Sequence, residues 1–193
     1  MPESAKTSPV AEALEATRAW VRDAVIGLNL CPFAKAPVVK GQVRYAVCET
    51  EDPRQLLVAL SDEMDRLAAA DPAETDTTLL IHPNVLLDFD DFNDFLFAAE
   101  TMLVERGHEG VLQIASFHPH YRFAGTAADD LGNATNRSPC PILHLLREAS
   151  VERAVDAFPQ AEAIYENNIA TLERLGAAGW EALAAGWRTG SRR

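Results

Sequence analysis

Hydrophobic residues recur at two spacings along the chain, and each spacing predicts a different kind of element. After Ser8 and Pro9, apolar residues return every three or four positions, which predicts an amphipathic helix of about five turns. Ser8 is a favourable N-cap and Pro9 suits the first helical position. Gly27 and Pro32 bracket the predicted end of this helix.

Short runs of β-branched and aliphatic residues predict three strands, at residues 43–48, 77–82 and 111–117. The segments between them, 53–70 and 89–106, carry their apolar residues on one helical face. Strand–helix–strand passages usually join parallel strands by right-handed crossovers. The pattern therefore predicts an α/β fold, with a small, mostly parallel sheet flanked by helices and an N-terminal helix.

The last third of the chain has a different pattern. A polar loop over residues 122–141 is longer than the loops of compact domains usually are. The sequence after it predicts a helical C-terminal segment, with helices at 142–157, 160–176 and 178–187. Trp180 and Trp187 share one face of the last helix. We expect that face to dock on the domain or on a second copy of the chain, which would make a homodimer.

Length and composition are typical of one globular domain. The chain has 193 residues, of which 48% are hydrophobic and 24% charged. We expect the domain to span residues 10–188, between disordered termini at 1–9 and 189–193. No run of about 18 apolar residues predicts a membrane helix, and no signal-peptide pattern opens the chain. The three scattered cysteines do not form a disulfide framework, so we expect a cytoplasmic protein that binds no membrane.

Charge and motifs exclude several classes of partner. The net charge is −12, and residues 49–109 alone carry 16 acidic and 3 basic side chains. This surface repels a phosphate backbone, so we expect no nucleic-acid partner. The acidic run 88–94 lacks the glycine of a calcium-binding loop. Since no Gly-x-Gly-x-x-Gly or phosphate-loop pattern occurs, we expect no nucleotide cofactor.

Histidines gather near the ends of the predicted strands. His82 follows the second strand and His118 follows the third. The carboxyl ends of parallel strands share one edge of a sheet, where open α/β proteins bind ligands. His144 and Glu148 are four residues apart on the predicted helix 142–157 and would share one face. His118, His144 and Glu148 together match the two-histidine, one-carboxylate ligand set of many iron and zinc sites.

Each candidate residue also has an alternative role. The histidines could instead bond nearby backbone carbonyls and serve only the fold. Arg137 and Arg147 could hold the carboxylate or phosphate of a small anionic substrate, or pair with acidic residues close to them in the sequence. Cys31 has an ordinary thiol if it ends the first helix. Its pKa is lowered if Pro32 opens a new turn with Cys31 as the N-cap.

Four motifs carry a resemblance to a known family. They are Leu30-Cys31-Pro32-Phe33-Ala34, Thr78-Leu79-Leu80-Ile81-His82-Pro83, Ala115-Ser116-Phe117-His118-Pro119-x-Tyr121-x-Phe123, and Asn133-x-Thr135-Asn136-Arg137-Ser138-Pro139-x-Pro141-x-Leu143-His144-Leu145-Leu146-Arg147-Glu148. On these motifs the chain resembles domain-of-unknown-function family 1415, a bacterial and plastid-type family, over nearly all of residues 15–176. The resemblance implies no reaction, substrate or fold. It places the candidate residues within family motifs and gives less weight to His120 and Cys140.

Three functions are consistent with these residues. The first is a small enzyme that depends on divalent iron or zinc and acts on a small anionic molecule. Its catalytic residues would be drawn from Cys31, His82, Arg137 and Arg147. The second is a metal-free enzyme that uses the Cys31 thiol as nucleophile or redox group, with a histidine within hydrogen-bond reach as its base. The third is a non-enzymatic protein that binds a small ligand.

Overall fold

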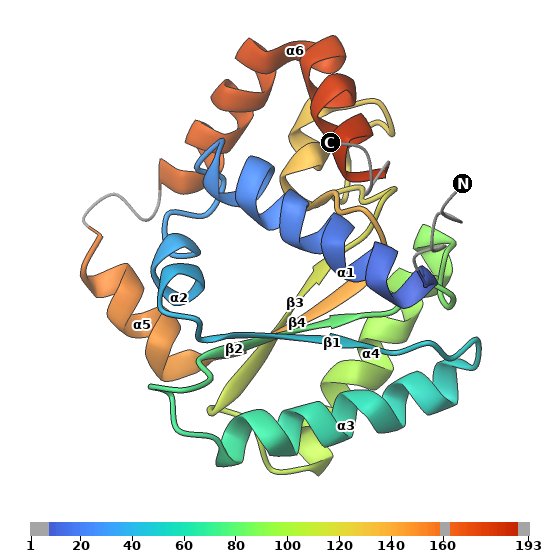
Figure 1. The fold of residues 1–193 in the computed structure, drawn as a ribbon, viewed down its shortest axis with the longest axis vertical. Coiled ribbons are helices and arrows are strands. Elements are labelled where there is room, and N and C mark those ends of the chain that lie inside the picture. The colour runs from blue at the N-terminus through green and yellow to red at the C-terminus, as the bar shows by residue number, and fades with distance from the viewer. Residues whose placement is uncertain (1–7, 159–162, 189–193) are drawn as a thin grey trace, which may run out of the picture.

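The computed structural model describes residues 8–158 and 163–188 and contains a four-stranded sheet with helices on both faces (Figure 1). The strands are β1 (Val43–Val47), β2 (Thr77–Ile81), β3 (Leu112–Phe117) and β4 (Ile142–Arg147). The helices are α1 (Pro9–Trp20), the π-helix η1 (Val21–Ile26), α2 (Lys35–Val39), α3 (Pro53–Ala69), α4 (Phe89–Glu105), the 3-10 helix η2 (Leu131–Asn136), α5 (Glu148–Asp156) and α6 (Ile164–Arg188). The disorder expected at both termini concerns mainly residues 1–7 and 189–193, which lie outside the described residues.

The sheet has the strand order β1-β2-β4-β3. β1 pairs with β2 in parallel, and α3 connects them as the sequence predicted. β4 pairs antiparallel with both β2 and β3, so β3 runs in the direction of β2 but does not touch it. The predicted α/β class is correct, whereas the prediction of a mostly parallel sheet is wrong because β4 stands between the two predicted neighbours.

The predicted helix at 142–157 is wrong over its first six residues, which form β4. Pro139 and Pro141 disfavour helical backbone in the residues before them and deliver the chain in an extended conformation. β4 is then hydrogen-bonded on both edges and largely buried, and this pairing outweighs the helix propensity of its leucines. Helix begins only at Glu148, the first residue of α5.

α3 and α4 cover one face of the sheet (Figure 1). Each helix begins at an aspartate whose carboxylate accepts backbone N–H groups of the first turn, Asp52 in α3 and Asp88 in α4. Their apolar stripes meet the sheet in a core that includes Leu56, Leu60, Met64, Leu67, Phe92, Ala99 and Leu103, together with Leu80, Leu143 and Leu145 from the strands.

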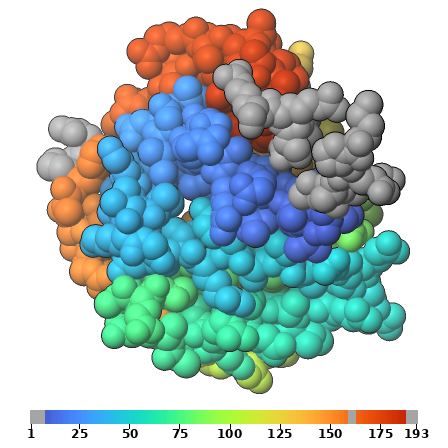
Figure 2. Space-filling model, in the orientation of Figure 1, coloured from blue at the N-terminus to red at the C-terminus, as the bar shows by residue number. Residues whose placement is uncertain are grey.

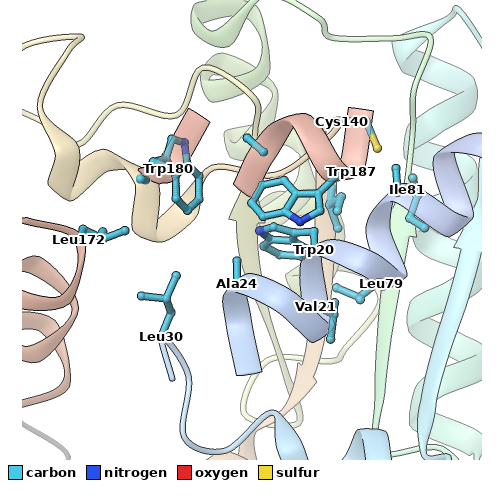
Figure 3. Packing of buried hydrophobic residues seen from close by; sticks show 14 residues of the cluster. Trp20, Val21, Ala24, Leu30, Leu79, Ile81, Cys140, Leu172, Trp180 and Trp187 are labelled. Carbon is cyan, nitrogen blue, oxygen red and sulfur yellow. The ribbon is translucent and has the colours of Figure 1, made fainter. Parts of the chain in front are cut away.

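α1 and η1 cover the opposite face, and α6 packs against α1 and η2. Figure 3 shows Trp20 from α1 and Trp187 from the end of α6 in one cluster with Leu79 and Ile81 of β2. Trp20, Trp180 and Trp187 are at most 4% exposed, so the expected burial of Trp20 and the docking of the terminal helix on the domain are confirmed. At Gly176 the backbone adopts φ 70° and splits α6 into two segments, close to the two helices expected there, although residues 160–162 of the first lie outside the described part.

The N-terminal helix begins at Pro9 as predicted, with Ser8 as its N-cap, whose hydroxyl accepts the N–H of Ala11. Its last part, η1, has π-helical geometry and ends at Ile26. Single π turns often accompany functional sites, because the extra residue changes where side chains point. Within residues 8–158 and 163–188, none of the helices has the length and apolar character that crossing a membrane requires.

Candidate functional site

Strand alternation places the candidate histidines on two opposite faces of the sheet. Successive side chains of a strand point to opposite sides. Leu143 and Leu145 of β4 pack in the α3–α4 core, so His144 between them faces α1. His82 and His118 both contact the ring of Phe92 in α4, with ring-centroid distances of 5.8 Å and 5.1 Å, and therefore lie on the α4 side. His144 is not part of their cluster.

His82 and His118 hold the loop that precedes α4. The Nδ1–H of His82 donates to the carbonyl of Val85 (3.0 Å), and the Nε2–H of His118 donates to the carbonyl of Leu86 (3.2 Å). The His118 Nδ1 accepts the backbone N–H of His120, which fixes this tautomer. Leu86 has a left-handed φ of 57°, which is strained for a leucine. The two imidazoles therefore serve to fix a strained turn.

Both imidazoles are neutral at pH 7. Burial lowers the pKa of His82 to about 4, and a charge on nearby His118 would lower it further. Burial likewise lowers the pKa of His118 to about 4. The Nε2 of His82 is buried and has no hydrogen-bond partner in the described part of the chain.

The three expected metal ligands do not meet. His118 lies on the α4 side of the sheet, and His144 lies on the α1 side within β4. The helix that was to bring His144 and Glu148 onto one face does not exist, because α5 begins only at Glu148. Among the described residues, no group of three or more His, Cys, Asp or Glu side chains could hold a metal ion. This donor set therefore does not fit iron or zinc.

Arg147 has a structural role. Its side chain is buried, and its Nη2 donates to the carbonyls of Leu67 (2.5 Å), Ala70 (2.7 Å) and Thr75 (3.1 Å). Leu67 and Ala70 stand at the C-terminal end of α3, where a cation also complements the helix dipole. Arg147 binds these carbonyls in place of an acidic neighbour such as Glu148, and it joins β4 to α3.

Arg137 lies elsewhere, beside a hollow of about 270 Å³ against α6. Its Nη2 donates to the carbonyl of Ala128 (2.6 Å) in the polar loop, and its Nε donates to that of Tyr121 (3.4 Å), just before the loop. Burial lowers the pKa of Arg137, while the charges of Glu181 and Asp130 oppose that change. Arg137 therefore shares no site with Arg147 or His144.

A larger cavity, of about 390 Å³, lies on the α1 side of the sheet. Its floor is the sheet surface and its roof is formed by α1, η1 and α2, and α5 contributes one wall. Figure 2 shows this face of the molecule hollowed where the residues of α1 and α2 meet. Most of the lining is apolar, including Trp20, Val21, Val25, Phe33, Val38, Leu79, Phe117 and Leu146. Such a volume with few polar groups is typical of a small-molecule site.

His144 supplies a polar group to the cavity floor. Burial lowers its pKa to about 4, so the imidazole is neutral at pH 7. Its Nε2 lies 2.6 Å from the Thr77 hydroxyl, and that hydroxyl lies 2.6 Å from the carbonyl of Leu145. The carbonyl can only accept a hydrogen bond, so the Thr77 hydroxyl donates its proton to that carbonyl. His144 must then donate from Nε2, and its Nδ1 carries a lone pair.

Cys31 lines the same cavity. It lies in the turn between η1 and α2, across the cavity from the sheet. Cys31 is not the N-cap of a helix, because α2 begins at Lys35 with Ala34 as its N-cap, although the backbone N–H groups of Phe33 and Ala34 favour a thiolate. Burial acts more strongly in the other direction and raises the pKa of the Cys31 thiol. Within the described residues no histidine is within hydrogen-bond distance of this sulfur, so Cys31 and His144 share the cavity without touching.

Three cavity residues were not among the sequence candidates. Thr77 fixes the His144 tautomer, Gln113 places an amide on the floor, and Trp20 forms part of the roof. Gln113, Ala115 and Phe117 are spaced two residues apart on β3 and therefore point to the same face, so a polar side chain lies beside a large apolar one. This polar residue at an otherwise apolar, two-residue spacing was the signal in the sequence that could have indicated the cavity floor.

No curated protein and no solved structure matches the chain. One family model, described as "Protein of unknown function (DUF1415)", matches residues 12–182. The matched span contains Cys31, His144 and the whole sheet, as well as the His82–His118 cluster. Because the match extends over most of the sequence, the chain belongs to the DUF1415 family.

Proposed function

We propose that this protein binds a small, mostly apolar molecule in the cavity between the sheet and α1 and α2. The observation that supports the proposal is the cavity itself, about 390 Å³ in volume and lined mainly by apolar side chains. Protein interiors are close-packed and contain few voids larger than a water molecule. An apolar space of this size is therefore expected to have an occupant. The metal ligands expected from the sequence lie on different faces of the sheet and do not support a metal-dependent enzyme.

Titration with N-phenyl-1-naphthylamine tests this proposal. The probe is uncharged and fluoresces strongly in apolar surroundings. We expect saturable binding of one probe per chain. Replacing Ala115, which lies on the cavity floor, by leucine should weaken that binding at least tenfold by filling the space.

The same substitution on an exposed surface is the matched control. Ala69 is exposed on α3, so Ala69→Leu should bind the probe as the unchanged protein does. Binding that does not saturate, or that is unaffected by Ala115→Leu, would overturn the proposal.

A second candidate function is a thiol-dependent reaction in the same cavity. It is favoured by one observation: the Cys31 thiol and His144, whose Nδ1 is unprotonated, line one cavity. A substrate held between them would touch both groups, and the imidazole would accept a proton as the thiol reacts. Because burial raises the pKa of Cys31, the thiol needs such a base to react at neutral pH.

The rate of Cys31 alkylation by iodoacetamide separates the two candidates. A thiol-dependent enzyme predicts rapid alkylation near pH 7 that slows at least tenfold in His144→Gln. A binding protein predicts slow alkylation that increases only above pH 9 and does not depend on His144. Cys48 in the background is replaced by serine so that only the cavity thiol and buried Cys140 remain.

A further inference from the structure

We propose that the molecule bound in the cavity is uncharged and carries a hydroxyl group that donates a hydrogen bond to Nδ1 of His144. This inference rests on the proposed binding function and adds the chemical class of the ligand. It starts from three neighbouring groups on the cavity floor: Thr77 on β2, His144 on β4 and Gln113 on β3.

The hydrogen bonds of Thr77 decide what His144 can offer a ligand. The Thr77 hydroxyl has one proton, which goes to the carbonyl of Leu145 at 2.6 Å. The imidazole therefore donates its own proton to Thr77 from Nε2. Nδ1 has no hydrogen-bond partner among the described residues, and it is not one of the sealed polar atoms of the core. It thus presents an acceptor to the cavity.

Gln113 supplies a second polar group within reach of the same point. Ala115 is paired directly with His144 across β3 and β4, so Gln113 is the diagonal neighbour of His144 on the same face. The Cα atoms of diagonal neighbours in an antiparallel pair are about 7–8 Å apart, which long side chains such as those of Gln113 and His144 can reach across, so one ligand oxygen can contact both. The Gln113 amide has no hydrogen-bond partner within the described part of the chain. A hydroxyl can donate to Nδ1 and accept from this amide at once.

The charged side chains of the cavity lining, Arg147 and Asp76, already have hydrogen-bond partners within the protein. The guanidinium of Arg147 donates to three backbone carbonyls. The carboxylate of Asp76 accepts the hydroxyl of Ser150 at 2.6 Å. A carboxylate ligand would face the Nδ1 lone pair, and no cation among the described lining residues is free to compensate for its lost hydration. The small anionic molecule expected from the sequence is therefore replaced by an uncharged one.

Calorimetric titration with three matched probes tests the ligand class. The probes are 4-butylphenol, 4-butylanisole, which lacks the donor proton, and 4-butylbenzoate, which is charged. We expect the phenol to bind about tenfold more tightly than the anisole, as one buried hydrogen bond supports, and the benzoate to bind most weakly. Equal affinity of phenol and anisole, or preferred binding of the benzoate, would overturn the inference.

Two substitutions show whether the preference comes from the floor. His144→Phe removes the acceptor and should reduce the preference for phenol over anisole to less than twofold. Gln113→Leu removes only the second group, from which the oxygen of either probe can accept, so it should weaken the phenol and the anisole alike, each about threefold, and it remains informative if His144→Phe does not fold. A preference that persists in folded His144→Phe, or a phenol affinity that Gln113→Leu leaves unchanged, would also overturn the inference. If neither the phenol series nor N-phenyl-1-naphthylamine binds, the proposed binding function itself fails.

Discussion

Replacing Ala115 by leucine should stabilise this protein, although adding volume to a protein interior usually destabilises it. Ala115 lies in the middle of β3, and its methyl group faces the cavity between Phe117 and His144. A leucine there can place its three extra carbons in the cavity without displacing a neighbour. The substitution therefore measures whether the cavity is real space in the folded protein.

The expected size of the effect follows from the added carbons. Each buried methylene contributes about 0.8 kcal/mol, so three contribute about 2.4 kcal/mol. Fixing the leucine side chain costs about 0.5–1 kcal/mol of conformational entropy. The free energy of unfolding should thus increase by about 1.5 kcal/mol. For a chain of this length, that corresponds to an increase in Tm of about 3–6 °C.

The matched control is Ala99→Leu, the same change at a fully buried position. Ala99 is 0% exposed in the packed α3–α4 core, where three extra carbons have no space. That variant should lose about 1–3 kcal/mol. Urea denaturation followed by circular dichroism measures both free energies. If Ala115→Leu is destabilised as much as Ala99→Leu, the cavity is filled by protein atoms and the reasoning is refuted.

Three further predictions concern buried polar groups. Arg147→Met should lower the free energy of unfolding by about 3 kcal/mol or more in urea, because it leaves buried carbonyls without a donor; a loss below 1 kcal/mol would contradict the proposed role. Thr77→Val should cost about 1–3 kcal/mol by the same measurement, since the hydroxyl bonds both His144 and Leu145, and an unchanged midpoint would contradict it. Burial lowers the pKa of His82 and His144 to about 4 in the folded protein, whereas a histidine in the unfolded chain has its ordinary pKa of about 6.5. Between these two values the unfolded chain binds more protons than the folded protein. Stability should therefore be full above about pH 6.5 and decrease toward pH 4, by up to about 1.4 kcal/mol per pH unit for each histidine, and a urea midpoint that is equal at pH 7 and pH 5 would disprove this.

The elements with clear boundaries could be predicted from the sequence. The predicted strands at 43–48, 77–82 and 111–117 agree with β1, β2 and β3 to within one residue at each end. The helices predicted at 53–70 and 89–106 agree equally well with α3 and α4. These segments have caps and a regular apolar spacing that depend only on local sequence.

β4 could not be recognised in the same way. Its apolar residues are nearly continuous, because the strand is covered on both faces, and a continuous run has no period that separates strand from helix. Its strand conformation depends on β2 and β3, which supply partners from distant parts of the chain. Only the flanking prolines gave a local indication of extended backbone.

Residues of the candidate site could be selected from the sequence, but which of them lie close together could not. Cys31 and His144 were both selected from the sequence, yet the partners expected for His144 were His118 and Glu148. Assigning His144 to a helix gave it a neighbour four residues away, whereas a strand gives it cross-strand neighbours such as Thr77. An error of secondary structure over six residues was therefore enough to change the predicted chemistry from metal binding to hydrogen bonding.

The position of β4 also determines when the molecule can fold during synthesis. The Thr77 hydroxyl bonds a carbonyl that is made 68 residues later, and β2 and β3 have no contact with each other without the strand between them. Until Ile142–Arg147 leaves the ribosome, both strands have an unpaired edge, and such edges favour aggregation. A nascent chain that stops before Ile142 should depend on chaperones to stay in solution, and adding the last strand should release it.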